Sequence, residues 1–310
     1  MTRMRAVMIA VVLSFATRLG AQPKPAARVA GKTQVVFLGT GNPAPTAETM
    51  GPAVAIVVNG ASYLVDAGVG VVRRAAEASA RGVPGLEMTK LERVFLTHLH
   101  SDHTMGLPDL IYTPWIMHRT VPLAVYGPEG TAAMTTHILE AWSADNDIRI
   151  NGLEHGNTSG YKVVAHEIQP GVVYQDSNVK VTAFLVNHGS WKQAFGYRFD
   201  TADRSIVLSG DTAPSEAVVA QCGGCDVLIH EVYSQMGYDV SPEAWKQYSR
   251  AFHTSTHELA ALATRARPKT LILYHQMYFG RPRDTRATQL AELRALYKGK
   301  VISARDLDVY

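Results

Sequence analysis

Four side chains that can bind a metal ion fall within six residues of this sequence. His98, His100, Asp102 and His103 lie in the segment THLHSDH, directly after the apolar stretch RVFL at residues 93–96. Alternate side chains of an extended segment point to the same side, so His98 and His100 share one face. The turn that follows lets Asp102 and His103 face a second point nearby. Imidazole and carboxylate groups together suit Zn²⁺ or another first-row ion, so the segment predicts a metal site at a strand end.

Further donors follow other apolar stretches, as a second metal ion would require. His188 follows VTAFLVN, Asp211 follows SIVLSG, His275 follows TLILY, and Asp66 follows SYLV. Strand ends are the usual place for binding residues on a sheet scaffold. Each residue alone could instead be a cap or a turn residue. Their common placement indicates one site with two metal ions.

Apolar periodicity and turn residues place the elements that must position these side chains. We expect strands over residues 34–38, 53–58, 62–65, 93–96, 123–126, 179–186, 196–199, 205–208, 226–229, 270–273 and 301–303. We expect helices over residues 71–80, 131–142, 215–221, 256–265 and 286–296, and a polar loop over residues 145–160. This layout predicts an α+β fold in which two sheets pack face to face with helices outside, an αββα sandwich.

The sequence resembles the metallo-β-lactamase superfamily. HLHSDH, preceded by LVDAG and followed by VNHG, SGDT and LYHQ, matches the five ordered motifs of that superfamily over roughly residues 33–280. The resemblance implies an αββα sandwich with the metal ions between its sheets. It implies that one ion is held by His98, His100 and His188, and the other by Asp102, His103 and His275. It also implies that Asp211 bridges the two ions and that Asp66 orients ligand imidazoles from behind.

Three further segments indicate a branch of the superfamily. FLGTGNPAP near the start, IHEVY at residues 229–233 and HTSTHELAALA at residues 253–263 resemble ribonuclease Z and arylsulfatase-like enzymes. In that branch a Glu matching Glu231 pairs with a His matching His253, which assists departure of the leaving group. The alternative is that Glu231 only ends a strand and His253 only caps a helix. True β-lactamases do not use a bridging Asp at the position of Asp211, so that activity is not expected.

The chemistry implied by this resemblance is metal-dependent hydrolysis of an ester bond. Two Zn²⁺ ions, with Mn²⁺ or Fe as alternatives, would lower the pKa of a bound water and supply hydroxide as the nucleophile. Asp102 or Asp211 would orient or deprotonate that nucleophile. His253, made more basic by Glu231, would protonate a poor leaving group.

The substrate expected from these features is a small-molecule ester, cleaved in a phosphodiesterase- or sulfatase-like reaction. Ribonuclease Z enzymes carry a basic loop after the FLGTG strand, where this chain has PTAETM at residues 45–50. They also carry a Gly-rich arm for tRNA, which has no counterpart between Gly127 and His188. Nucleic acid is therefore considered unlikely as a partner, and a homodimer remains one option. The alternatives are a tRNA 3′-end endonuclease of the ribonuclease Z type, a non-hydrolytic iron oxidoreductase, a lactonase or β-lactamase, and a non-catalytic metal-binding module.

The start of the chain predicts export to the periplasm or the medium. Arg3 and Arg5 precede the apolar run AVMIAVVLSFAT, which is too short to span a bilayer but fits a secretory signal peptide over residues 1–21. A retained N-terminal anchor is the alternative. After cleavage no stable membrane span is expected, and one hydrolase domain would cover residues 33–310.

Charge and cysteine content complete the picture. The chain has 30 basic and 27 acidic residues, and three of the basic ones lie in the signal peptide, so the mature chain is neutral. No dense basic run is present that would bind a phosphate backbone.

The two cysteines, Cys222 and Cys225, form the segment CGGC and are too few donors for a four-ligand zinc site. In an exported protein a local disulfide is expected, with two structural thiols as the alternative.

Overall fold

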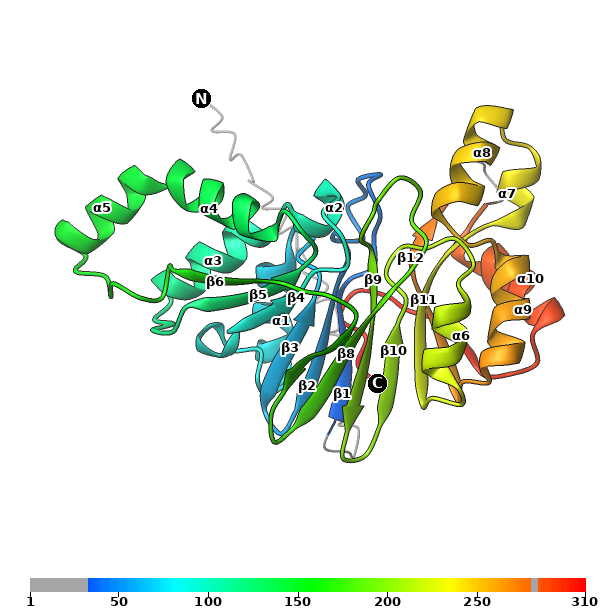
Figure 1. Cartoon of the computed structure of the whole chain (residues 1–310), viewed down its shortest axis with the longest axis horizontal. Coiled ribbons are helices and arrows are strands. Elements are labelled where there is room, and N and C mark those ends of the chain that lie inside the picture. Colours follow the sequence, from blue (N-terminus) through cyan, green and yellow to red (C-terminus); the bar gives the residue numbers. More distant parts are fainter. Residues whose placement is uncertain (1–32, 280–283) are drawn as a thin grey trace, which may run out of the picture.

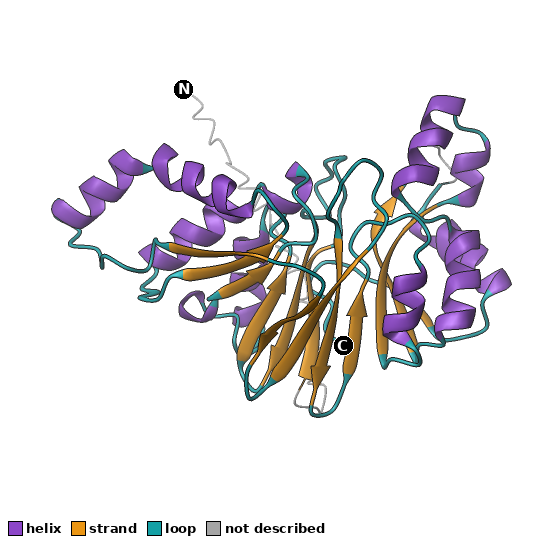
Figure 2. Ribbon diagram, viewed as in Figure 1, coloured by secondary structure: helices purple, strands orange, loops and turns teal. Residues whose placement is uncertain are grey.

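Two β-sheets face each other in the middle of the molecule (Figures 1 and 2). This computed structural model describes residues 33–279 and 284–310, so the expected signal peptide lies outside the described residues. The first sheet contains six strands in the order β1 (Thr33–Gly39), β2 (Ala53–Val58), β3 (Ala61–Val65), β4 (Arg93–Phe95), β5 (Leu123–Gly127) and β6 (Val163–Glu167). The second contains seven strands in the order β13 (Val301–Ser303), β12 (Thr270–Met277), β11 (Val227–Tyr233), β10 (Ser205–Leu208), β9 (Phe195–Thr201), β8 (Val179–Leu185) and β7 (Gly171–Gln175).

Helices cover the outer side of each sheet. The first sheet is flanked by α1 (Val71–Ala80), α3 (Leu107–Ile116), α4 (Thr131–Ala141) and α5 (Ser143–Asn151). The second is flanked by α6 (Glu216–Cys222), α9 (Thr256–Ala266) and α10 (Arg286–Leu296). Two more helices, α7 (Gln235–Asp239) and α8 (Glu243–Phe252), stand above this second group in Figure 1. The expected αββα sandwich is confirmed. Among the described residues, no helix is long and apolar enough to cross a membrane.

The strands are apolar on both faces because both faces are covered. Val36 packs in the layer between the first sheet and its helices, whereas its neighbour Val35 packs between the sheets. In the second sheet, Leu228 packs toward the outer helices and Ile229 toward the first sheet. Neighbouring residues of a strand point to opposite faces, so continuous apolar runs are what a buried sheet requires.

Strand direction collects the functional loops at one end of the sandwich. In the first sheet β3, β4 and β5 are parallel, and in the second β10, β11 and β12 are parallel. Both β8 and β10 run antiparallel to β9, so β8 has the same direction as β10. The loops that follow these strands lie along the upper edge of the sandwich in Figure 2.

The opposite end is tied together across the two sheets. The turn between β2 and β3 has positive φ angles at Asn59 and Gly60, 50° and 76°, as the Asn-Gly hairpin predicts. Asn59 donates from Nδ2 to Asn178 at 2.9 Å. Tyr63 of β3 donates to Asp176 at 2.6 Å, just before β8 begins. Asp176 also accepts a hydrogen bond from Tyr174 at 2.9 Å.

A buried arginine completes the covering helix α3. Pro114 lies inside α3 and has no N–H to offer the carbonyl of Leu110, four residues earlier. The fully buried guanidinium of Arg119 replaces that donor. Burial lowers the pKa of Arg119 to about 10. The guanidinium donates at 2.7–3.0 Å to four backbone carbonyls, those of Leu91, Leu110, Ile111 and Gly160.

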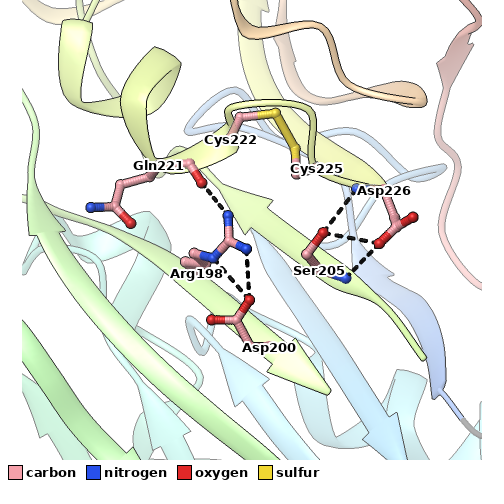
Figure 3. The surroundings of a disulfide bond; sticks show 7 residues. All are labelled: Arg198, Asp200, Ser205, Gln221, Cys222, Cys225 and Asp226. Carbon is pink, nitrogen blue, oxygen red and sulfur yellow. Dashed lines mark hydrogen bonds and ion pairs between the residues drawn. A yellow bond between two sulfur atoms is a disulfide. The ribbon is translucent and has the colours of Figure 1, made fainter. Parts of the chain in front are cut away.

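A disulfide closes the turn between α6 and β11 (Figure 3). Cys222 ends α6 and is bonded to Cys225, so the expected local disulfide is present. The two glycines between them have φ angles of 45° and 91°, in the region that favours glycine. The next residue, Asp226, accepts hydrogen bonds from the backbone and hydroxyl of Ser205 at 2.8 and 2.9 Å.

One expected element is wrong. The polar loop expected over residues 145–160 contains most of α5. This helix buries none of its residues, so it has no apolar stripe that a sequence pattern could reveal. It is supported instead by the ion pair of Arg149 with Asp145 at 2.9 Å, four residues apart.

Candidate metal centre

The seven donor side chains expected from the sequence come together at the shared strand ends. His98 and His100 follow β4, while Asp102 and His103 lie in the short helix α2 (Ser101–Thr104). The other three belong to the second sheet: His188 after β8, Asp211 after β10, and His275 within β12. Most of these side chains are buried, whereas His100 and Asp102 are half-buried.

Three imidazoles form the first group of donors. Nδ1 of His100 lies 3.0 Å from Nε2 of His98 and 3.1 Å from Nε2 of His188. A tetrahedral ion with metal–nitrogen bonds of about 2.0–2.1 Å places its ligand atoms about 3.3 Å apart. The three nitrogens are therefore spaced as one face of a coordination tetrahedron.

Two imidazoles and two carboxylates form the second group. Oδ2 of Asp102 lies 3.5 Å from Nε2 of His103 and 3.3 Å from Nε2 of His275. Oδ2 of Asp211 lies 3.4 and 3.3 Å from the same two nitrogens. Asp211 is also grouped with His98 and His103 within 4.8 Å, so it stands between the two sets of donors.

Unpaired buried atoms support a metal ion at this centre. Within the described part of the chain, Nε2 of His103 and Oδ1 of Asp211 are buried and have no hydrogen-bond partner. Such atoms are rare in folded proteins and need an explanation. Burial lowers the pKa of His98 well below its usual value, which favours the neutral imidazole that binds metal. Burial opposes a charge on His103, yet Asp211 and Asp66 raise its pKa well above the usual value. The residues present fit a pair of metal ions.

Asp66 holds the ligand rings of both groups from behind. Its Oδ2 accepts a hydrogen bond from Nδ1 of His103 at 2.8 Å, and its Oδ1 accepts one from the backbone N–H of Thr97 at 2.8 Å. The hydroxyl of Thr97 lies 3.0 Å from Nδ1 of His98. Thr97 was not identified from the sequence, since only its position before His98 could have suggested it.

Other partners of the rings come from loops. His188 donates from Nδ1 to the carbonyl of Phe252 at 2.8 Å, and Trp191 donates from Nε1 to Nε2 of His100 at 2.9 Å. His275 is held differently, because its Nδ1 is buried without a partner among the described residues. Its backbone is displaced by a β-bulge in which Glu231 pairs with Tyr274 and Val232 with Gln276.

Two residues of the centre lie on unusual backbone. His275 has φ 42° and Asp66 has φ 61°, in the left-handed region that non-glycine residues avoid. The bulge turns the His275 side chain out of the regular ladder and toward the donors.

Glu231 and His253 lie close together beside these donors, although neither Oε2 of Glu231 nor Nδ1 of His253 has a hydrogen-bond partner among the described residues. Nδ1 of His253 lies 3.5 Å from Oε2 of Glu231 and 4.0 Å from Oδ2 of Asp211. Burial and the charge of Asp211 raise the pKa of Glu231 well above its usual value, and burial lowers the pKa of His253. Oε1 of Glu231 accepts a hydrogen bond from the backbone N–H of Thr254 at 2.9 Å. The cap of α9 is Ser255, so His253 has no capping role there.

The remaining histidines stand apart from the centre. His230 is buried and its Nδ1 donates to the carbonyl of Glu231 at 2.7 Å. His257 is exposed on α9. Four more are exposed elsewhere: His118, His137, His155 and His166.

Two cavities flank the centre, and residues 42–44 contribute to both. A cavity of about 340 Å³ is lined by this segment together with Ser101 and Asp102. A larger one of about 860 Å³ is lined by the same segment, by α8 and by His253. Asn42 anchors the segment by donating to the carbonyl of Gln276 at 2.7 Å.

Comparison with known families identifies the fold. A sequence profile described as "Beta-lactamase superfamily domain" matches residues 62–276. The chain belongs to the metallo-β-lactamase superfamily. One similar solved structure is the metallo-β-lactamase fold protein YhfI from Bacillus subtilis. It has TM-score 0.69 and 18% identity, and the match covers 90% of this chain and 99% of the other. The human short-form tRNase Z has TM-score 0.64, 23% identity and coverage of 89% and 98%.

Curated relatives place this metallo-β-lactamase superfamily member in the ribonuclease Z-like branch. A Ribonuclease Z of Mycobacterium sp. (strain KMS) is 35% identical over 247 residues, which cover 79% of this chain and 84% of the relative. A Ribonuclease Z of Mycobacterium bovis (strain BCG / Pasteur 1173P2) is 31% identical over 246 residues, covering 78% and 85%.

These relatives contradict two expectations drawn from the sequence. The expected small-ester substrate and the exclusion of nucleic acid as a partner are both wrong, because the matching relatives are named for a ribonuclease. The exclusion relied on a neutral net charge and on two missing segments. Net charge sums the whole chain and carries no information about the local surface that meets a substrate.

Proposed function

We propose that this chain is a metal-dependent endoribonuclease of the ribonuclease Z type, which hydrolyses a phosphodiester bond at the 3′ end of tRNA precursors. The observation that carries the proposal is the pairing of His253 with Glu231 at 3.5 Å, beside Asp211 and the metal-binding donors. An acid placed beside such donors suits a reaction with a poor leaving group, and the ribose hydroxyl released from RNA is one. The curated relatives supply the substrate class.

The metal ions in this proposal are two Zn²⁺. His98, His100 and His188 would hold one ion and Asp102, His103 and His275 the other, and Asp211, which lies between the two groups, could serve both. Imidazole and carboxylate donors also accept Mn²⁺ or Fe. When bound, such a pair makes water acidic enough to attack at neutral pH and polarises the phosphoryl group.

The protein's own residues then handle the leaving group. His253 presents Nδ1 to Glu231, and its Nε2 lies 3.4 Å from the hydroxyl of Tyr248 at the large cavity. As the new bond from water oxygen to phosphorus forms, the bond to the ribose oxygen breaks. His253 in its imidazolium form gives that oxygen a proton from Nε2 and is left as the neutral imidazole, the form that burial favours. Glu231 is a positioning residue that keeps the ring turned this way, held by the N–H of Thr254.

The test uses mature protein, residues 22–310, loaded with metal and incubated with a tRNA precursor that carries a 3′ trailer. We expect two metal ions per chain, cleavage at the trailer junction and loss of cleavage on chelation. KM should rise steeply with salt, as for other phosphate-backbone ligands. Loaded protein that leaves both the precursor and unstructured RNA intact would overturn the proposal.

Two histidine variants make the test specific. His103→Ala removes a donor of the second group and should release about one metal ion per chain and abolish cleavage. His137→Ala is the matched control, because His137 is exposed on α4 and its ion pair is with Glu140, at 2.8 Å, outside the group of metal donors. It should leave both metal content and cleavage unchanged.

A further inference from the structure

The aromatic face of α8 is exposed at Trp245 and Tyr248, whereas Phe252 at its end packs against His188. Trp245, Tyr248 and Phe252 are spaced three and four residues apart, so they share one side of the helix. Only Ser249 of this helix is buried. Trp245 is 57% exposed and Tyr248 is 39% exposed. Large rings left open in this way usually mark a binding surface.

Two of these rings, Trp245 and Tyr248, line the large cavity beside the reactive centre. The cavity of about 860 Å³ lies within the size range of small-ligand sites. Tyr278, also 39% exposed, contributes from the segment after β12. The cavity is lined by Asn42, Pro43, Ala44, Ser241, Pro242, Ala244, Trp245, Tyr248, Ser249, His253, Met277, Tyr278 and Phe279.

The lining suits a flat, uncharged ring. Among the lining residues that the structure describes, none is a Lys, Arg, Asp or Glu, and most are aromatic, apolar or small. Tyr248 is stacked on Phe252 at 4.7 Å and is met at its other side by Trp245, at 5.7 Å and nearly perpendicular. Nucleobases bind to single-strand sites by stacking on such rings.

We propose that this cavity holds the base of the nucleoside whose ribose oxygen leaves the phosphorus. The inference rests on the proposed function, because it assigns one side of an RNA substrate. It follows from continuity: Tyr248 lines the cavity and its hydroxyl lies 3.4 Å from the Nε2 that protonates the leaving oxygen. The smaller cavity, lined by Ser101 and Asp102, lies toward the second group of metal donors and away from His253.

Stacking predicts little preference for one base over another, since every base has a π-face. The neutral polar side chains of the lining include Asn42, Ser241 and Ser249. We therefore expect the cavity to hold the leaving nucleoside in place for proton transfer without selecting one base over another.

The test compares RNA substrates with and without a base at one position. The cleaved linkage is mapped first, and an abasic ribose is then placed on each side of it in turn. With wild-type protein, loss of the leaving-side base should lower kcat/KM by about 5- to 150-fold, the range for one stacked base. Loss of the base on the other side should change kcat/KM much less. Trp245→Ala should lower kcat/KM on the intact RNA but not on the leaving-side abasic RNA, and Trp245→Phe should restore most of it.

A binding measurement separates this inference from the proposed function. RNA with 2-aminopurine as the leaving-side base is mixed with metal-free protein, which cannot cleave it. Quenching that is lost in Trp245→Ala but kept in Trp142→Ala supports stacking in this cavity. Trp142 is a matched control, 42% exposed and in contact with Tyr112 on the far side of the first sheet.

The outcomes are distinct. Quenching without cleavage of any RNA would overturn the proposed function and leave only a base-binding cavity, with no leaving side assigned to it. Cleavage that is equally fast on intact and leaving-side abasic RNA, with no effect of Trp245→Ala on quenching, would overturn the base site alone.

Discussion

Asp66 accepts a hydrogen bond from His103 at 2.8 Å and reaches His98 through the hydroxyl of Thr97. One carboxylate thus supports a ring in each group of metal donors. We expect Asp66→Ala to weaken binding of both ions by about 10- to 100-fold, the usual effect of losing such a partner. Competition with a chromophoric chelator measures both affinities. Thr97→Val removes only the link to His98 and should weaken mainly the first site. Equal weakening of both sites by Thr97→Val would contradict this arrangement.

His253 should matter only when the leaving group needs a proton. We expect His253→Ala to slow cleavage of RNA by about 10²- to 10⁴-fold, the range for acid–base assistance. A nitrophenyl phosphodiester, whose leaving group departs as an anion, should be slowed far less. Glu231→Gln should reproduce this pattern more weakly, since it disturbs the orientation of His253 without removing it. Metal content should stay at the wild-type level in both variants. Equal losses on the two substrates would assign His253 to substrate placement.

Arg119 should be essential to the fold because of Pro114. Arg119→Met leaves four buried carbonyls without a donor and should lower the free energy of unfolding by about 3–5 kcal/mol, measured with urea. In a Pro114→Ala background the new N–H can bind the carbonyl of Leu110, so Arg119→Met should cost less there. Equal costs in both backgrounds would show that Arg119 does not substitute for the missing donor.

Asp176 should make stability depend on acid pH. Burial opposes the charge on Asp176, but hydrogen bonds from Tyr63, Tyr174 and two backbone N–H groups lower the pKa of its carboxyl below the usual value. The stabilisation is therefore present above the unfolded pKa, about 3.9, and is lost as pH falls through the lower folded value. Asp176→Asn should cost about 1 kcal/mol at pH 7 and almost nothing near pH 2. Asp147→Asn, an exposed control on α5, should cost little at either pH.

Export remains a prediction, motivated by Arg3, Arg5 and the apolar run after them. N-terminal sequencing of periplasmic or secreted protein should begin near Gln22, and recovery of intact protein only from the cytosol would contradict it. Export would separate the protein from tRNA precursors in the cytosol, so this measurement also bears on the proposed substrate. The Cys222–Cys225 disulfide agrees with an oxidising compartment. It closes a short loop, so Cys222→Ser with Cys225→Ser should lower stability by about 2 kcal/mol at most. Cleavage should be unaffected, because Cys225 precedes Glu231 by six residues along β11, about 20 Å.

The donor set could be predicted from the sequence because its members follow apolar stretches directly. Asp66, His98 and Asp211 each come within three residues of the end of a strand, and parallel strands bring such ends together. The bounds of α1, β2, β10, α10 and β13 agree with the expected ranges. Both results depend on residue patterns within single segments of the sequence, and the folded structure retains those segments as strands and helices.

What could not be predicted depends on contacts between distant segments. The bulge at His275 arises from the pairing of β12 with β11, and the expected strand stopped at residue 273. The aromatic residues of α8 form a stripe like that of a core helix, and only the structure shows that Trp245 and Tyr248 stay exposed among the described residues. The small-ester substrate was predicted from two missing segments, whereas the relatives named Ribonuclease Z are similar to this chain over 78–79% of its length.

The left-handed backbone at Asp66 and His275 limits which substitutions can raise the stability of this enzyme without loss of activity. Glycine at either position would relieve strain of about 1–3 kcal/mol. The same change would remove the carboxylate behind two rings or one of the seven donors. Directed evolution that selects only for heat resistance should therefore yield variants with Gly or Asn at these positions. These variants should be metal-free and inactive. Screens that retain metal binding as a second criterion should instead find their gains at the exposed surface of α5, far from the strand ends that hold the centre.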